Sequence, residues 1–255
     1  MNCVVLAAGY ATRLYPLTEH FPKPLLKVGK KTIIDWLVDD VDRFGKIDRF
    51  TVVSNARYAD NFRQWRDAKA LGRDGLIPTR APIEVLDDGS TTNETRVGAV
   101  KDILFALENA NLSGDLLVLA GDNVLDFSLG AFVDYFERVD GSAIMRYYEP
   151  EPALLRKCGV LELGEGDRVV GMVEKPAEPK THWCVPPFYA YRGLTPDKLR
   201  DALAKGCGYD APGSLAAWLC EREPVYAFEM PGRRYDVGDL ESYRKISAQY
   251  EGFKD

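Results

Sequence analysis

Two cations flank a glycine turn near the start of the chain, and their spacing suits the binding of a phosphate chain. Residues 3–8 (Cys-Val-Val-Leu-Ala-Ala) form a short apolar run that Gly9 ends, and Arg13 and Lys23 follow. A buried strand that opens into a turn of small residues lets backbone N–H groups approach phosphate oxygens, which nearby cations neutralise. A solvated basic edge is the alternative for such cations, but both lie inside the motif.

Two aspartates far apart in the sequence each lie within two residues of a glycine, a position that suits a metal ion. Asp122 follows a predominantly apolar run, residues 115–120, within Gly-Asp-Asn, and Asp236 lies within Tyr-Asp-Val-Gly. An acid at the end of a buried strand can hold a hard cation that bridges it to phosphate oxygens. Mg²⁺ needs only one or two carboxylates when phosphates supply further ligands. A turn or a helix cap is the alternative use of either aspartate.

A third polar group ends a predicted strand in the second half of the chain. Glu174 and Lys175 precede Pro176, which turns the chain out of the strand and presents both side chains at its end. Lysine is a point charge on a long flexible stem, which suits the phosphate of a small substrate. An exposed Glu-Lys-Pro turn without a ligand explains the same residues equally well.

Alternating strands and helices predict the framework that must position these groups. Apolar runs alternate with amphipathic segments through residue 148, which predicts an α/β fold with a doubly wound sheet. Ligands of such sheets bind at the carboxyl ends of the strands. The predicted strands are residues 3–8, 50–54, 83–86, 115–120 and 143–148, and the predicted helices are 33–41, 58–68, 97–107 and 128–138.

The second half of the chain changes character, because two strands there are joined by a tight turn. Gly164–Asp167 has the turn chemistry of a β-hairpin between residues 160–163 and 168–173. Further strands are predicted at residues 185–191 and 225–230, and further helices at 196–204, 214–221 and 243–250. No repeat or linker interrupts the sequence, so we expect a single domain over residues 1–255.

Composition excludes several classes of protein. A net charge of −6 over 255 residues gives no excess of cations for a nucleic-acid backbone. Five scattered cysteines without a C-x-x-C pair predict neither a disulfide framework nor a zinc site. No run approaches the ~18 apolar residues that a membrane helix needs. We therefore expect a cytoplasmic protein that binds neither nucleic acid nor membrane.

Five motifs in order resemble those of the sugar-phosphate nucleotidyltransferases (NDP-sugar pyrophosphorylases), and particularly glucose-1-phosphate thymidylyltransferase-like enzymes. They are Ala-Ala-Gly-x-x-Thr-Arg-Leu-x-Pro-Leu-Thr at 7–18, Pro-Lys-Pro at 22–24, Gly-Asp-Asn at 121–123, Glu-Lys-Pro at 174–176 and Asp-Val-Gly at 236–238. The resemblance covers nearly the whole chain. It implies a Rossmann-like, GT-A-like fold of three layers with a mixed sheet, whose nucleotide-binding half spans about 1–140 and acceptor half about 141–255.

The resemblance also implies a role for each matching residue. Arg13 would stabilise the departing pyrophosphate, and Lys23 the α-phosphate region or the acceptor phosphate. Asp122 and Asp236 would hold Mg²⁺, and Lys175 would anchor the acceptor phosphate. The implied nucleotide-binding residues are Leu6, Ala7, Ala8, Gly9, Thr12, Arg13, Asn93, Glu94 and Gly98. The implied sugar-phosphate-binding residues are Gly159, Glu174, Lys175 and Tyr189. The implied catalytic residues are Arg13, Lys23, Asp122 and Lys175. Core packing explains Tyr189 about as well.

The segment that would recognise the base departs from the family pattern. Gly98 stands where thymidylyl enzymes usually carry a base-reading glutamine. Asn93, Glu94 and Arg96 are candidates to recognise base edges, although capping of the next helix explains Glu94 equally. Pro187 also replaces the familiar glycine before Tyr189. These departures leave the base and the acceptor open.

The implied reaction joins a nucleoside triphosphate to a sugar 1-phosphate and releases pyrophosphate and an NDP-sugar. Two alternatives stay open. One is a cytidylyltransferase of the same fold that acts on a non-sugar phosphate or phosphonate. The other is a catalytically silent nucleotide-sugar sensor, which the retained Arg13, Lys23, Asp122 and Asp236 argue against. Relatives often form dimers or tetramers, so a homo-oligomer is open as well.

Overall fold

The computed structural model describes residues 1–253, except for the side chain of Asp236, and these residues form two compact units. Unit 1 comprises residues 1–97, 120–130 and the chain from 231 onward, and unit 2 comprises residues 98–119 and 131–230. Each unit thus combines segments that are far apart in the sequence. The single domain with halves meeting near residue 140 stays a prediction.

A parallel sheet is the framework of unit 1. β1 (Asn2–Leu6) pairs with β4 (Arg49–Ser54), and β4 pairs with β5 (Ile83–Asp87). The three central side chains of β1 are fully buried, as expected for a strand covered on both faces. The crossovers carry α1 (Ile33–Asp42) and α2 (Ala59–Ala70). Parallel pairing brings the ends of these strands to the same edge, where the glycine turn follows β1.

Local sequence explains where α1 begins and which face it buries. The Thr32 hydroxyl accepts a hydrogen bond from the backbone N–H of Asp35 at 3.2 Å, which caps the first turn. Apolar residues at helical spacing are all buried: Ile33, Ile34, Leu37, Val38 and Val41.

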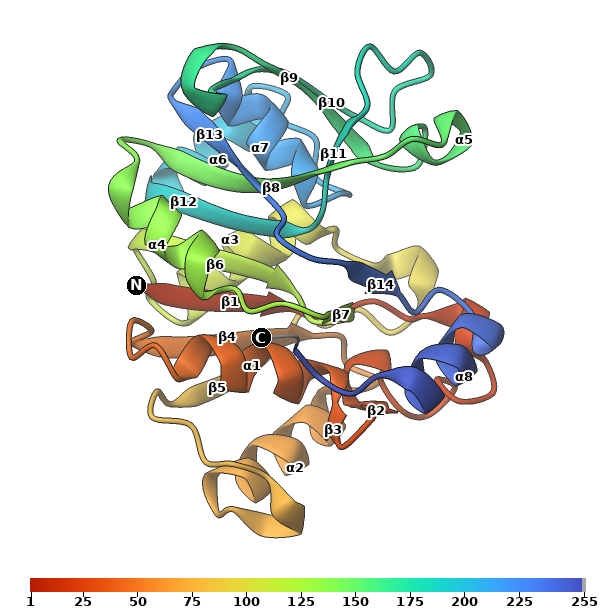
Figure 1. Ribbon diagram of the computed structural model, residues 1–255. Helices are drawn as coiled ribbons and strands as arrows, with labels where there is room; N and C mark the ends of the chain where they lie inside the picture. The colour runs from red at the N-terminus through yellow and green to blue at the C-terminus, as the bar shows by residue number, and fades with distance from the viewer. Residues whose placement is uncertain (254–255) are drawn as a thin grey trace. The chain divides into compact units, whose positions relative to one another are not determined.

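A two-stranded ribbon brings the end of the chain beside residues 123–125. β7 (Asn123–Leu125) and β14 (Arg234–Asp236) run antiparallel and lie side by side in Figure 1. Their register places the backbone of Asp236 opposite Asn123. α8 (Leu240–Gln249) follows β14. The remaining elements of unit 1 are η1 (Thr12–Leu14), η2 (Lys23–Leu25), β2 (Lys27–Val28), β3 (Lys31–Thr32), η3 (Arg73–Gly75) and η4 (Asn93–Thr95).

Unit 2 is built on a largely antiparallel sheet. Its strands follow the order β6 (Gly114–Ala120), β12 (Phe188–Leu194), β8 (Ser142–Tyr148), β11 (Trp183–Val185), β9 (Gly159–Leu163) and β10 (Val169–Glu174), with β13 (Val225–Glu229) parallel to β8. Its helices are α3 (Ala99–Asn109), α4 (Gly130–Arg138), α5 (Pro152–Leu155), α6 (Pro196–Ala204) and α7 (Gly213–Cys220), with a 3-10 turn η5 (Glu165–Asp167) between β9 and β10. The predicted hairpin is therefore present.

Most predicted elements match the structure, with differences at short elements and helix ends. The single strand predicted at residues 185–191 is wrong: the structure has two strands, β11 and β12, which Pro186 and Pro187 separate because proline cannot donate to the ladder. The sequence pattern predicts neither β7, β14 nor α5, because three or four residues carry too little periodicity. The last helix starts at Leu240, three residues before the predicted start, because Asp239 caps it through the backbone N–H of Ser242 at 2.8 Å. No helix within residues 1–253 is long and apolar enough to cross a membrane.

Candidate active site

The glycine turn is held in place by hydrogen bonds to its backbone. The Ala7 N–H donates to the carbonyl of Val53 at 2.8 Å, and the buried Asn55 side chain donates to the carbonyl of Ala8 at 2.9 Å. A Cβ added to Gly9 would meet no atom within 4 Å. The protein itself therefore does not need a glycine there, whereas close approach of a ligand to the backbone would.

The residues after the turn form a second supported loop. Ala11 adopts a left-handed conformation, with φ of 45°, and its carbonyl accepts a hydrogen bond from the Thr18 hydroxyl at 2.8 Å. The carbonyl of Thr18 in turn accepts from the hydroxyl of buried Tyr58. η1 lies within this loop and leaves the side chains of Thr12 and Arg13 exposed. Arg13, the predicted phosphate-binding cation, is thus exposed on a loop that hydrogen bonds from Thr18 and Tyr58 hold in place.

Lys23 and Asp122, which are 99 residues apart in sequence, meet in unit 1. The Lys23 ammonium lies 2.8 Å from Oδ2 of Asp122; the lysine side chain is 8% exposed and the aspartate side chain 45%. Burial by itself raises the pKa of Asp122, but the charge and hydrogen bond of Lys23, with a further contribution from Arg234, outweigh it and leave the pKa below its ordinary value. The carboxylate is therefore ionised at neutral pH.

Asn123 connects Asp122 to the C-terminal strand. Its buried amide donates to Oδ1 of Asp122 at 2.9 Å and to the carbonyl of Ala120 at 3.2 Å. Its amide oxygen accepts a hydrogen bond from the Arg234 guanidinium at 3.1 Å. These three contacts fix the orientation of the amide, because a flipped amide would face two acceptors with its oxygen. Sequence reasoning missed both Asn123 and Arg234, since neither carries a distinctive spacing.

The donor set around Asp122 fits a Mg²⁺ ion of the kind that shares its ligands with phosphate. The two carboxylate oxygens accept from Lys23 and Asn123, and a carboxylate offers about four acceptor sites, which leaves capacity for a cation. The backbone of Asp236 lies opposite Asn123, while the Asp236 side chain is outside the described residues. No cluster of three or more His, Cys, Asp or Glu side chains that could hold a metal occurs in the described part of the chain. One or two carboxylates completed by phosphate oxygens would suit Mg²⁺ here.

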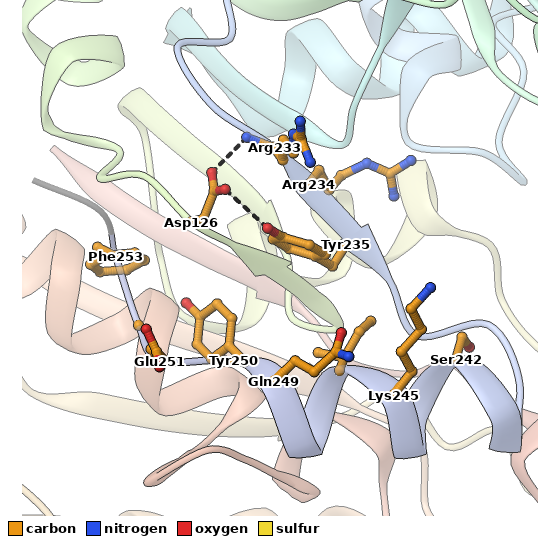
Figure 2. A pocket seen from close by; sticks show the side chains of 12 residues that line it. Asp126, Arg233, Arg234, Tyr235, Ser242, Lys245, Gln249, Tyr250, Glu251 and Phe253 are labelled. Atoms are coloured by element: carbon orange, nitrogen blue, oxygen red, sulfur yellow. Dashed lines mark hydrogen bonds between the residues drawn. The ribbon is translucent and has the colours of Figure 1, made fainter.

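A cavity of about 830 Å³ lies in unit 1 between β14 and α8, and Figure 2 shows the side chains around it. Asp126 anchors β14 at its edge by accepting hydrogen bonds from the Arg233 N–H at 2.6 Å and the Tyr235 hydroxyl at 3.0 Å. Among its lining residues within the described chain, none belongs to the predicted catalytic set, but Arg234 reaches Asn123. The cavity therefore adjoins the strand that supports Asp122.

Asn93 and Glu94 lie in η4 with exposed side chains. Thr92 caps this short helix, since its hydroxyl accepts from the backbone N–H of Thr95 at 3.3 Å. The pKa of Glu94 is lowered by a hydrogen bond from its own backbone N–H and by one from Thr92. Glu94 therefore supports the first turn of η4 and does not cap α3, the alternative suggested by the sequence, because the N-cap position of α3 is Gly98.

Gly98, at the start of α3 in unit 2, is required by its surroundings. Its φ is +101°, and an added Cβ would lie 2.8 Å from the backbone oxygen of Tyr209. The N–H groups of Ala99 and Val100 donate to the carbonyls of Asp210 and Tyr209 at 3.1 and 2.9 Å. A glutamine at this position would be strained by the backbone conformation alone.

The predicted acceptor residues of unit 2 gather around Glu174. An added Cβ at Gly159 would lie 3.0 Å from Oε2 of Glu174, so the backbone of β9 lies close to this carboxylate. Tyr189, 2% exposed, points its hydroxyl toward the same place from β12, 3.3 Å from a Cβ that would be added at Gly213. Burial raises the pKa of Glu174, and the neighbouring Lys175 charge opposes this. Tyr189 is thus both a core residue and a neighbour of the acceptor group.

Lys175 is exposed and adopts a left-handed backbone conformation, with φ of 49°. Its N–H donates to the carbonyl of Cys158 at 3.0 Å, which ties the end of β10 to the residue before β9. Gly213 completes the group but was not predicted, because a lone glycine before a helix is a common sequence feature. Only the structure shows that Gly213 lies against the Glu174 carboxylate, since a Cβ added to it would lie 2.4 Å from Oε2.

The family model described as Nucleotidyl transferase matches residues 2–252, nearly the whole chain. The chain belongs to this nucleotidyl transferase family. The membership in a nucleotidyl transferase family that the five motifs predicted is therefore confirmed.

Curated relatives within the family act on different nucleotides. A glucose-1-phosphate thymidylyltransferase of Mycolicibacterium smegmatis is 30% identical over 202 residues, which is 78% of this chain and 64% of that protein. The bifunctional protein GlmU of Methanococcus vannielii is 28% identical over 93% of this chain and 52% of its own length. A UTP–glucose-1-phosphate uridylyltransferase of Staphylococcus saprophyticus is 26% identical over 98% of this chain and 91% of its own length. The chain thus spans 64% of the length of the first of these curated relatives and 52% of the length of the second.

Solved structures confirm the fold of this nucleotidyl transferase. A UDP-glucose pyrophosphorylase in complex with UDP-glucose matches it with a TM-score of 0.80 and 21% identity, over 98% of this chain and 97% of that one. The UTP-bound enzyme from Acinetobacter baumannii matches with a TM-score of 0.75 and 18% identity, over 98% of this chain and 92% of that one. The predicted α/β class with a mixed sheet is therefore correct.

Proposed function

We propose that this nucleotidyl transferase joins a nucleoside triphosphate to a sugar 1-phosphate and releases pyrophosphate and an NDP-sugar. An oxygen of the sugar phosphate attacks the α-phosphorus, and the bond from that phosphorus to the β-phosphate oxygen breaks. The observation that carries the proposal is the ion pair between Lys23 and Asp122, because it combines a buried cation with an ionised carboxylate. Such a reaction needs positioning and neutralisation of charge more than covalent chemistry by the protein.

The side chains of unit 1 serve the nucleotide in this proposal. The backbone of residues 6–9 approaches the phosphates, Thr12 and Arg13 bind their outer oxygens, and Arg13 stabilises the departing pyrophosphate. Lys23 neutralises the α-phosphate region. Asn93 and Glu94 recognise the base.

Asp122 and Asp236 would hold a Mg²⁺ ion together with the substrate phosphates. Bound there, the ion supplies charge neutralisation for the reacting phosphate oxygens. Asn123 and Arg234 keep the Asp122 carboxylate oriented for this task.

The side chains of unit 2 serve the acceptor. Glu174 accepts hydrogen bonds from sugar hydroxyls, Lys175 binds the sugar phosphate, and the backbone at Gly159 contacts the ring. Tyr189 borders the acceptor, and Gly98 is proposed as a nucleotide-binding residue. We place this activity in the cytoplasm, a reducing compartment where the cysteine side chains stay as thiols.

An activity panel tests the proposal directly. Pyrophosphate release is measured for each nucleoside triphosphate with a set of sugar 1-phosphates, in the presence and absence of Mg²⁺. At least one pair should be turned over, and Asp122→Asn and Arg13→Ala variants that remain folded should lose about 100-fold or more. Near wild-type turnover in either variant would refute the role given to that residue.

The same panel tests the two alternatives from the sequence. Turnover of CTP with polyol phosphates or phosphonates, and of no sugar phosphate, would replace the sugar acceptor with a non-sugar one. Binding of nucleotide and sugar phosphate without pyrophosphate release from any pair would indicate a sensor and would overturn the proposed reaction.

A further inference from the structure

The carboxylate of Glu174 occupies a gap between two glycines from different elements of unit 2. A Cβ added to Gly213, the first residue of α7, would lie 2.4 Å from Oε2 of Glu174, and one added to Gly159 would lie 3.0 Å from the same atom. α7 packs against β10, the strand that Glu174 ends. Neither glycine has a positive φ, so the lack of space for a side chain, and not the backbone conformation, favours glycine at both positions.

The remaining walls of this gap cannot move away easily. The methyl group of Met172 would lie 3.1 Å from the Cβ at Gly213, and the hydroxyl of Tyr189 would lie 3.3 Å from it. Met172 is 8% exposed and Tyr189 is 2% exposed, so both are packed on their other sides. A methyl group at Gly213 would therefore displace the Glu174 carboxylate, whose flexible side chain is the part that can give way.

The Glu174 carboxylate makes no hydrogen bond or ion pair within the described chain, while its backbone pairs with Gly159 of β9. It is half-buried, and burial raises its pKa. A carboxylate that loses water without gaining a donor from the protein costs free energy. Hydroxyl groups of a bound ligand would supply the missing donors, which points to a polyhydroxylated ligand at this carboxylate.

We propose that Gly213 is a positioning residue that sets the depth of the Glu174 carboxylate and thereby which sugar ring the acceptor site admits. With Oε2 against the two glycines, Oε1 is the oxygen that meets the ring hydroxyls. A side chain at Gly213 pushes the carboxylate forward into the volume of the ring. This inference rests on the proposed function, because it assumes that the ring belongs to the sugar 1-phosphate acceptor.

The variant Gly213→Ala separates this role from a merely structural one. Gly213 has no positive φ and the Glu174 side chain can move aside, so the variant should stay folded with a thermal midpoint close to that of the wild type. The KM for the sugar 1-phosphate should rise at least tenfold, while the KM for the nucleoside triphosphate should stay within twofold. A purely structural effect would lower the thermal midpoint and change both constants.

Two further variants complete the design. In Gly213→Ala/Glu174→Asp the shorter acid vacates the space that the new methyl group needs, so part of the lost acceptor affinity should return. Gly171→Ala is the matched control: it adds the same methyl group to β10, where the nearest atom is a flexible oxygen of Glu162 at 3.4 Å. The control should leave both KM values unchanged.

Titration calorimetry with glucose 1-phosphate gives a readout that does not depend on turnover. Weaker binding by Gly213→Ala than by Gly171→Ala, with restoration in the double variant, would support the inference. An active wild-type enzyme with unchanged KM and unchanged binding in Gly213→Ala would overturn the role of Gly213 and leave the proposed function intact. A wild-type protein that neither turns over any pair nor binds a sugar phosphate would overturn both.

Discussion

Replacing Arg234 with alanine tests whether this arginine orients the Asp122 carboxylate through Asn123. Asn123 is 3% exposed, and its amide oxygen accepts from Arg234 at 3.1 Å while its amide nitrogen donates to Asp122 at 2.9 Å. Without Arg234 the amide oxygen loses this donor and the amide is free to turn. Asp122 then keeps Lys23 but loses a fixed partner for Oδ1.

The structure sets the size of the expected effect. A buried polar atom left without its partner costs about 1–3 kcal/mol, and removal of a half-exposed arginine admits water, which keeps the cost near the lower end. A cost of about 1–2 kcal/mol corresponds to about 5–30-fold in a binding constant, at 1.36 kcal/mol for each factor of ten. We expect this loss in the apparent affinity for the divalent cation.

Two measurements report that affinity. Electron paramagnetic resonance of free Mn²⁺ follows binding in the presence of a non-reacting nucleotide analogue, and the Mg²⁺ dependence of pyrophosphate release follows it during turnover. Arg234→Lys keeps a donor and should recover part of the loss. Arg233→Ala is the matched control, since its exposed side chain is removed while its backbone N–H still donates to Asp126.

Equal cation affinity in Arg234→Ala and wild type would refute this reasoning. So would an equal loss in Arg233→Ala, because a general weakening of β14 would then explain both variants. A fall in maximal rate alone, at unchanged half-saturation by Mg²⁺, would place Arg234 at the substrate and not behind Asp122.

Three other predictions concern the pH dependence of acceptor use and the stability of the protein. Burial raises the pKa of Glu174, and binding of sugar hydroxyls needs its ionised form. The kcat/KM for the sugar phosphate should therefore fall as the pH drops through a value above the ordinary glutamate pKa. In Glu174→Gln this fall at low pH should be absent. Lys69→Met should lower the free energy of unfolding in urea by about 3–5 kcal/mol, since it leaves Asp35, 2.9 Å from the ammonium and 1% exposed, without its counter-ion; a change below 1 kcal/mol would contradict this. Gly98→Ala should destabilise the protein by about 1–3 kcal/mol through its positive φ and the Tyr209 carbonyl, and calorimetric unfolding measures it.

The phosphate-binding part of the site could be proposed from the sequence because its residues are close together along the chain, and it stays a prediction. The glycine turn, Arg13 and Lys23 all lie within residues 9–23, in two neighbouring motifs. The resemblance then linked Asp122 and Asp236, which no local pattern relates. The structure confirms that the backbones at these places are neighbours, since the register sets Asp236 opposite Asn123.

What the sequence could not predict are contacts made by ordinary residues across long separations. Asn123 follows a predicted acid and Arg234 precedes one, yet only the pairing of two three-residue strands brings them together. Gly213 likewise has no distinctive neighbours in sequence. Its role depends on where the carboxylate of Glu174 lies, which is a fact of packing and not of pattern.

The position of Asp122 depends on the last part of the chain through a series of contacts within unit 1. Tyr250 donates a hydrogen bond to the carbonyl of Leu125 in β7, and its ring packs edge-on against Trp36 of α1 with centroids 5.1 Å apart. Tyr243 donates to the carbonyl of Lys27 at 2.9 Å, so α8 is fastened to β2 as well.

These contacts hold α8 beside β14, and β14 in turn supplies the arginine that fixes the Asn123 amide. Lys23 reaches Asp122 from the opposite end of the chain. A three-residue strand contributes little stability of its own, so the position of β14 depends on its hydrogen bonds to Asp126 and on the helix that follows it. The Asp122 carboxylate, which we propose holds the metal, thus takes its orientation from both the first and the last segments of the chain, through Lys23 on one side and Asn123 with Arg234 on the other.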